Sequence, residues 1–98
     1  MHGTIRHYAS SELADQLAAR SDEVESLMSN VPGLRSYHLI RTEDGCASVT
    51  VCDDQAGTDE STRIAGNWIR ENLPNLAPTA PDISSGEVIV QAGSTVRA

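Results

Sequence analysis

Two histidines and one tryptophan have side chains that could carry out chemistry on a small organic molecule. His7 and His38 lie in segments that alternate like β-strands, and Trp68 lies in a segment with helical periodicity. A neutral histidine can take a proton from a phenol near neutral pH, and an indole can stack on an aromatic ring. We predict a catalytic set of His7, His38 and Trp68, with His7 as base or orienting donor. Each residue also has a structural alternative. His7 could be a core or interface histidine, His38 could have a structural or surface role, and Trp68 could simply pack in the core.

Patterns for metal, phosphate and nucleophile chemistry are missing from the sequence. His2, His7 and His38 form no HxH pattern and have no matching carboxylate pair, so no metal site is expected. No glycine-rich phosphate loop and no serine on a nucleophile elbow occurs, and we expect no bound cofactor.

The two cysteines are expected to be reduced. Cys46 and Cys52 lie six residues apart in one predicted strand, which is about 20 Å, whereas the Cα atoms of bonded cysteines lie within about 7 Å. The first residues lack the pattern of a signal peptide. We therefore expect a cytoplasmic protein with two small buried cysteines, a functional thiol being the alternative.

Length and charge limit the classes of partner. The 98 residues make a single domain, residues 1–98, with a small core. The chain has 14 acidic and 7 basic residues, a net charge of −7, which argues against nucleic acid because cations supply most of that affinity. No apolar run approaches the roughly 20 residues that span a bilayer, so no membrane partner is expected.

Apolar periodicity predicts four strands and two amphipathic helices. The first helix begins at Ser10, runs for about five turns and ends at Pro32-Gly33. Asp53 and Asp54 begin the second helix, Pro74 ends it, and close packing is expected to explain Gly66 within it. The strands are 3–9, 34–42, 46–52 and a last one near 86–91, and the turn 43–45 joins the middle two as a hairpin.

This order predicts an α+β, ferredoxin-like βαββαβ fold, in which both helices cover one face of a four-stranded antiparallel sheet. Alternation along the strands separates two sets of side chains. The more apolar set is expected to meet the helices: Ile5, His7, Val49, Val51, Val88 and Val90, with His38 and Ile40 as a match.

The side chains on the other face of the predicted sheet are too apolar for a surface that contacts only water. We expect them to pack sheet to sheet in a homodimer through the open sheet face, the alternative being a lone domain with one wet face. Arg6 would then need a partner such as Glu87. The set comprises Thr4, Arg6, Tyr8, Tyr37, Leu39, Ser48, Thr50, Cys52 and Ile89.

Five segments share their pattern with one known family. They are Gly-Thr-Ile-Arg-His-Tyr at 3–8, Val-Pro-Gly-Leu at 31–34, Val-Thr-Val-Cys-Asp-Asp-Gln-Ala at 49–56, Ala-Gly-Asn-Trp-Ile-Arg-Glu-Asn-Leu-Pro at 65–74 and Gly-Glu-Val-Ile-Val at 86–90. Across nearly the whole chain they resemble the antibiotic biosynthesis monooxygenase-like branch of the dimeric α/β-barrel superfamily. The resemblance implies two ferredoxin-like subunits that form a barrel, with a pocket between helices and sheet in each.

Members of that family include cofactor-free quinol and polyketide oxygenases, haem-degrading enzymes and proteins with no established activity. Trp68 matches a tryptophan on the second helix of the haem-degrading members, which also use a histidine soon after it and an asparagine on the first strand. Here no histidine follows His38, and the first strand has Ile5, Arg6 and His7, so the resemblance disfavours haem degradation.

Two functions remain as hypotheses. The first is a cofactor-independent oxygenase, a cofactor-free monooxygenase of a small aromatic or quinone-like compound. The second is a non-catalytic dimer that binds a small apolar or aromatic ligand or is purely structural. A pocket of roughly 300 Å³ or more beside His7 and Trp68 would favour the enzyme.

Overall fold

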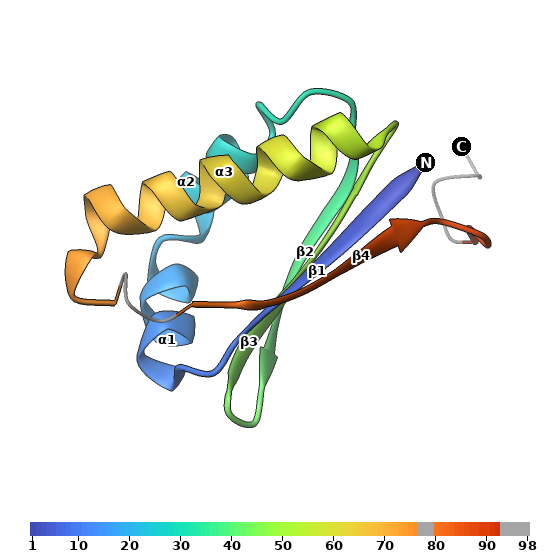
Figure 1. Cartoon of the computed structure of the whole chain (residues 1–98). Helices are drawn as coiled ribbons and strands as arrows, with labels where there is room; N and C mark the ends of the chain where they lie inside the picture. The colour runs from blue at the N-terminus through green and yellow to red at the C-terminus, as the bar shows by residue number, and fades with distance from the viewer. Residues whose placement is uncertain (77–79, 93–98) are drawn as a thin grey trace.

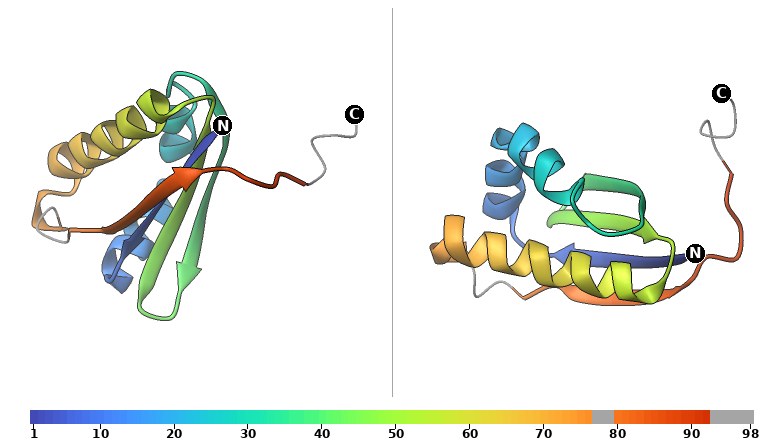
Figure 2. Two further views of the ribbon diagram at one scale, coloured as in Figure 1. Left: turned by 45° about the vertical axis from the view of Figure 1, so that its right-hand side comes forward. Right: turned by 90° about the horizontal axis from the view of Figure 1, so that it is seen from above.

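The protein folds as a four-stranded antiparallel sheet with helices on one face. The computed structural model describes residues 1–76 and 80–92. Figure 1 and Figure 2 show the three α-helices on the same side of the sheet. The strand order is β2-β3-β1-β4, and the predicted ferredoxin-like fold is confirmed. The elements are β1 (His2–Tyr8), α1 (Ser11–Ala19), α2 (Ser21–Met28), β2 (Leu34–Thr42), β3 (Gly45–Cys52), α3 (Gln55–Asn72), the short 3-10 helix η1 (Pro74–Leu76) and β4 (Asp82–Glu87).

Helix starts and the hairpin lie where the sequence places them. The Ser10 hydroxyl accepts a hydrogen bond from the Leu13 amide (3.1 Å), and the Asp54 carboxylate accepts one from the Gly57 amide (3.1 Å). Such side chains satisfy amides that have no partner within the helix. Gly33 has a φ of 71°, a conformation that side chains other than glycine rarely adopt, and so permits the turn before β2.

The single long helix expected after β1 is two helices. The chain breaks at Arg20 (φ −117°, ψ 34°), whose amide donates to the Leu17 carbonyl (3.2 Å). The next turn carries Asp22 and Glu23, and acidic residues at a helix start stabilise it through the helix dipole. Apolar periodicity continues across the break, which is why it predicted one helix.

The last strand lies earlier than the expected segment 86–91. β4 pairs with β1 from His7↔Asp82 to His2↔Glu87, and β1 begins at His2. After Glu87, one further hydrogen bond joins the Val88 amide to the Met1 carbonyl (3.0 Å). Within the described residues no strand pairs with Ile89 and Val90, and both are exposed despite their high β propensity.

The predicted assignment of the two sheet faces is wrong. Thr4, Arg6 and Tyr8 of β1 are buried on the helix side, whereas Ile5 and Ile40 of the open face are 48% and 50% exposed. Tyr37, Leu39, Ser48, Thr50 and Cys52 share the covered face, and His7, His38, Val49 and Val51 share the open one. The polar side can be covered because α3 supplies hydroxyl groups to Arg6. Glu87, the partner expected for Arg6, lies opposite His2 and forms no ion pair with this arginine.

The core lies between this covered face and the helices. Its apolar members are Tyr8, Leu13, Ala14, Leu17, Val24, Met28, Val31, Cys46, Cys52, Trp68, Ile69 and Leu73. Both thiols are free and buried, and burial raises the pKa of each, so they stay protonated near neutral pH. No helix within the described residues is long and apolar enough to cross a bilayer.

Two glycines of α3 differ in what surrounds them. A Cβ atom at Gly57 would lie 2.6 Å from the Pro32 carbonyl oxygen and 2.8 Å from the Cys52 Cβ. One at Gly66 would meet only an Arg70 nitrogen, 3.5 Å away, so the expectation that close packing explains Gly66 is wrong.

We expect Gly57→Ala to lower the free energy of unfolding by about 2 kcal/mol, because β3 or the Pro32 backbone must shift. Gly66→Ala in the same helix is the control, and should raise it by up to about 1 kcal/mol through helix propensity. Urea unfolding followed by circular dichroism measures both. Equal effects of the two substitutions would contradict this account of helix packing.

Candidate functional site

A cavity of about 470 Å³ lies between the α1–α2 pair and strands β2 and β3. Its walls are mainly apolar, and Glu25, Tyr37 and Arg41 bring ionisable groups to it. The Arg41 guanidinium donates to the Asp15 carboxylate (2.7 Å), which ties β2 to α1 beside this space. The residues lining it are Ala14, Leu17, Ala18, Ser21, Val24, Glu25, Met28, Ser29, Leu34, Tyr37, Leu39, Arg41 and Cys46.

A second cavity, of about 20 Å³, lies deeper in the core. Leu17, Val24, Met28, Tyr37 and Leu39 line both cavities, so these side chains separate the two spaces. Arg6, Tyr8, Leu27, Ser48, Ala65, Trp68 and Ile69 complete the small one. We call the larger space the outer cavity and the smaller the inner cavity.

Arg6 is the charged group of the inner cavity, and only 1% of its surface is exposed. Its Nη1 donates to the hydroxyls of Ser61 (3.0 Å) and Thr62 (3.1 Å) on α3, and its Nη2 to that of Thr50 (3.4 Å) on β3. The hydroxyls fix the orientation of the guanidinium but carry no charge. No carboxylate within the described residues forms an ion pair with Arg6.

The two tyrosines of the covered face lie beside this guanidinium. Burial raises the pKa of Tyr37 to about 12, although the charge of Arg6 opposes the shift. Burial raises the pKa of Tyr8 as well, again against the effect of Arg6. Both phenols are therefore neutral near pH 7, and Tyr37 is a hydroxyl donor on the wall between the two cavities.

Trp68 is held in place from α2. Its Nε1 donates to the Glu23 carboxylate (3.1 Å), and the Arg20 guanidinium lies 5.7 Å from the ring centroid, within range of a cation–π contact. The residue is 8% exposed and lines the inner cavity. The core role that was left open for Trp68 is thus the one observed, in a position that also borders a cavity.

The predicted set of His7, His38 and Trp68 is not brought together in this chain. His7 and His38 lie on the open face, across the sheet from Trp68. His7 Nε2 hydrogen bonds the Asp44 carboxylate (3.0 Å), which helps to hold the pKa of Asp44 below its usual value, and His38 is exposed. Within the described residues, no histidine lines either cavity and no cluster of three or more His, Cys, Asp or Glu side chains could hold a metal ion.

Sequence reasoning missed Arg6 and Tyr37 as site residues, although one signal for Arg6 was available. Thr58, Ser61 and Thr62 recur at the three- and four-residue spacing of one helix face, and all three are at least half-buried. Hydroxyl groups on the buried face of a helix need partners, which predicts a polar group on the sheet beneath. Nothing comparable in the sequence identified Tyr37.

Tyr37→Phe should reduce the loss of stability at alkaline pH. Because the pKa of Tyr37 rises from 10.0 to about 12 on folding, its contribution is complete below pH 10 and is lost as pH rises toward 12. Between pH 10 and 12 the free energy of unfolding of the wild type should fall by up to about 1.4 kcal/mol per pH unit more than that of the variant. Urea unfolding between pH 8 and 11 measures the difference, and parallel curves for the two proteins would contradict the burial of this phenol.

No protein-family model and no curated protein matches the sequence. Solved structures match the fold. A putative antibiotic biosynthesis monooxygenase from Chloroflexus aurantiacus is 19% identical, with a TM-score of 0.65, covering 94% of this chain and 96% of that one. The heme-degrader MhuD from Mycobacterium tuberculosis, with two hemes bound in its active site, is 17% identical, with a TM-score of 0.61 and coverage of 95% and 100%.

SnoaB, a cofactor-independent oxygenase from Streptomyces nogalater, is 10% identical, with a TM-score of 0.58 and coverage of 93% and 94%. Because these identities are low, the matches bear on the fold and not on the activity. The chain therefore has the ferredoxin-like fold of antibiotic biosynthesis monooxygenase-like proteins, as its sequence resemblance predicts.

Proposed function

We propose that the protein binds a small aromatic or quinone-like molecule in the outer cavity and oxidises it with O₂ without a cofactor. The observation that carries the proposal is this largely apolar space of about 470 Å³ between helices and sheet, which neither His7 nor Trp68 lines, contrary to the expectation of a pocket beside them. Ligand sites are commonly apolar cavities of 300–1,000 Å³ with a few polar groups that orient the ligand. The fold it shares with a cofactor-independent oxygenase adds support.

Oxygenation without a cofactor needs a substrate that can ionise, because the electron-rich anion supplies the electrons that reduce O₂. In the outer cavity Glu25 is the carboxylate that could accept the proton, and Tyr37 is a donor that could orient the substrate oxygen. His7 and His38 lie on the other face, so a role for either as base requires a second site at the open face.

A non-catalytic binding protein is the second candidate. It is favoured by the composition of the cavity walls, where no described residue is a histidine and the one lining carboxylate, Glu25, is exposed. The two functions share the outer cavity and differ in whether O₂ is consumed.

Ala18→Trp should weaken binding of quinols by about tenfold or more, because the indole would occupy the outer cavity that Ala18 lines. Ala19→Trp is the matched control, since both alanines are exposed on α1 and only Ala18 lines the cavity. Calorimetric titration with a panel of quinols measures affinity, and an oxygen electrode measures O₂ uptake.

The outcomes separate the two candidates. Quinol binding with O₂ uptake, both reduced by Ala18→Trp alone, supports the oxygenase. Binding without O₂ uptake identifies a binding protein, and no binding to wild type overturns both. A His7→Ala variant that keeps the wild-type rate removes His7 from the mechanism.

The open sheet face is proposed to form the interface of a homodimer. Ile5 and Ile40 are half-exposed there, and Val49 and Val51 are partly buried beside them. Contiguous apolar surface of this kind usually marks an interaction site, and a two-fold axis lets one surface pack on a second copy of itself.

Ile5→Lys should dissociate the dimer, raising its dissociation constant about 100-fold or more, because an unpaired ammonium would be buried. Ile83→Lys is the matched control. Ile83 is 50% exposed, against 48% for Ile5, but lies on the helix side of the sheet. Sedimentation equilibrium reports the mass, and a wild-type particle of 10.5 kDa would contradict the dimer.

A further inference from the structure

We propose that Arg6 and Ser48 form an anion subsite, which takes the ionised oxygen of a phenol-type ligand whose ring occupies the outer cavity. The inference rests on ligand binding in that cavity, as proposed above, and not on oxygenation. It names the chemical class of ligand: a small aromatic ring that bears an acidic hydroxyl group.

Arg6 carries a buried charge. An arginine stays protonated in proteins, and moving an unpaired charge into the interior is costly. Arg6 is 1% exposed, and its Nη1 and Nη2 donate to three neutral hydroxyls. The inner cavity therefore holds a positive charge for which the described residues supply no counter-ion.

Two buried polar atoms beside the inner cavity lack hydrogen-bond partners. Among the described residues, the buried side-chain nitrogens and oxygens without a hydrogen-bond partner are Arg6 Nε and Ser48 Oγ. Both residues are 1% exposed, and both line the inner cavity. Natural proteins leave few such atoms unsatisfied, so two around one space indicate a shared acceptor.

The inner cavity is small and shares a wall with the outer cavity. About 20 Å³ is room for one oxygen-sized atom. Five side chains line both cavities, and they include the unbranched Met28 and the phenol Tyr37. A phenol whose ring occupies the outer cavity therefore places its oxygen in the inner cavity when one of these shared side chains, such as the flexible Met28, changes rotamer.

A water molecule could also satisfy Arg6 Nε and Ser48 Oγ, but it would leave the charge of Arg6 uncompensated. An ionised oxygen would accept both hydrogen bonds and neutralise the guanidinium, and charge-assisted bonds are the stronger kind. Arg6 would consequently lower the pKa of a bound phenol and hold it as the anion, which is the form that reacts with O₂.

The test uses two probes that differ in one group: 4-nitrophenol, whose anion is coloured, and its methyl ether 4-nitroanisole, which cannot ionise. Wild-type protein should bind the phenol at least tenfold more tightly than the ether. Absorbance titration should show the pKa of the bound phenol about one unit or more below that of the free phenol.

Ser48→Ala should weaken phenol binding about five- to tenfold and leave ether binding unchanged, because it removes one donor at little cost in volume. Ser36→Ala, on the open face of β2, is the control and should change neither. Arg6→Gln should abolish the pKa shift of the bound phenol, and where that variant does not fold, Ser48→Ala decides the matter.

Equal affinities for the two probes, unaffected by Ser48→Ala, would show that the inner cavity holds water only, and the anion subsite would be wrong while cavity binding survived. If wild type binds quinols but neither probe, the anion subsite is wrong while cavity binding survives, and if it binds neither the probes nor the quinols, both proposals fail. The two failures are thus distinguishable.

Discussion

The burial of one guanidinium organises the space between sheet and helices. Arg6 lies in the central part of the sheet, and its Nη1 is hydrogen bonded because α3 presents Ser61 and Thr62 to it. Ser61 lies on the buried side of α3 together with Trp68 and Ile69, so these bonds hold against the sheet the same helix face that supplies the core. The position of β1, α3 and the inner cavity thus depends on a single buried cation.

The starts of α1 and α3 and the hairpin were predicted correctly from the sequence, whereas the assignment of the two sheet faces failed because Arg6 is buried. Local signals predicted local structure: Ser10 and Asp54 cap their helices, and the turn before Gly45 closes the hairpin. The faces were inverted because β1 alternates between Ile5 or His7 and Thr4, Arg6 or Tyr8, and hydrophobicity alone favours burying the first group. The covered face of a sheet can be polar when the helix that packs on it also presents polar groups, as α3 does with Ser61 and Thr62.

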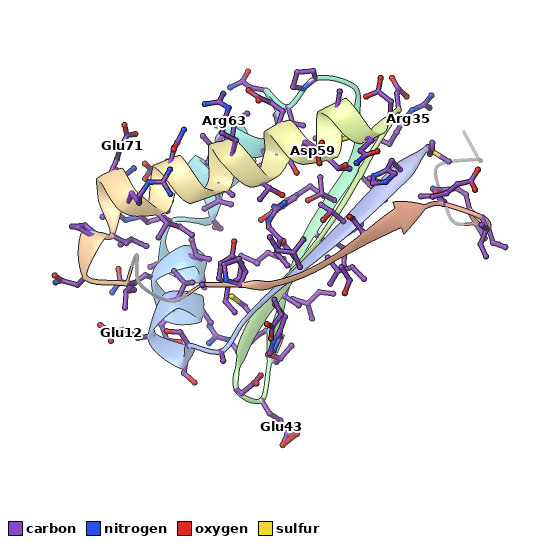
Figure 3. The ribbon with its side chains drawn as sticks, in the orientation of Figure 1. Glu12, Arg35, Glu43, Asp59, Arg63 and Glu71 are labelled. Carbon is purple, nitrogen blue, oxygen red and sulfur yellow. The ribbon has the colours of Figure 1, made fainter. Side chains whose placement is uncertain are left out.

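The candidate site depends on contacts that no local pattern encodes. Side chains from α1, α2, β2 and β3 line the outer cavity, so its existence follows from how the α1–α2 pair lies over the hairpin. Trp68 was identified because a lone tryptophan in a small domain stands out, whereas Tyr37 gained its place only through packing. Other acidic groups lie at the periphery: Glu12, Glu43 and Glu71 point away from the body of the protein in Figure 3.

The break at Arg20 has a mechanical consequence. α1 packs against β3, while α2 packs against α3 and holds Trp68 through Glu23. The helical wall of the outer cavity therefore consists of two short helices that pack against different elements and are joined at Arg20. Because α1 and α2 are not part of the sheet, a change of angle at Arg20 would widen or narrow the outer cavity without altering strand register.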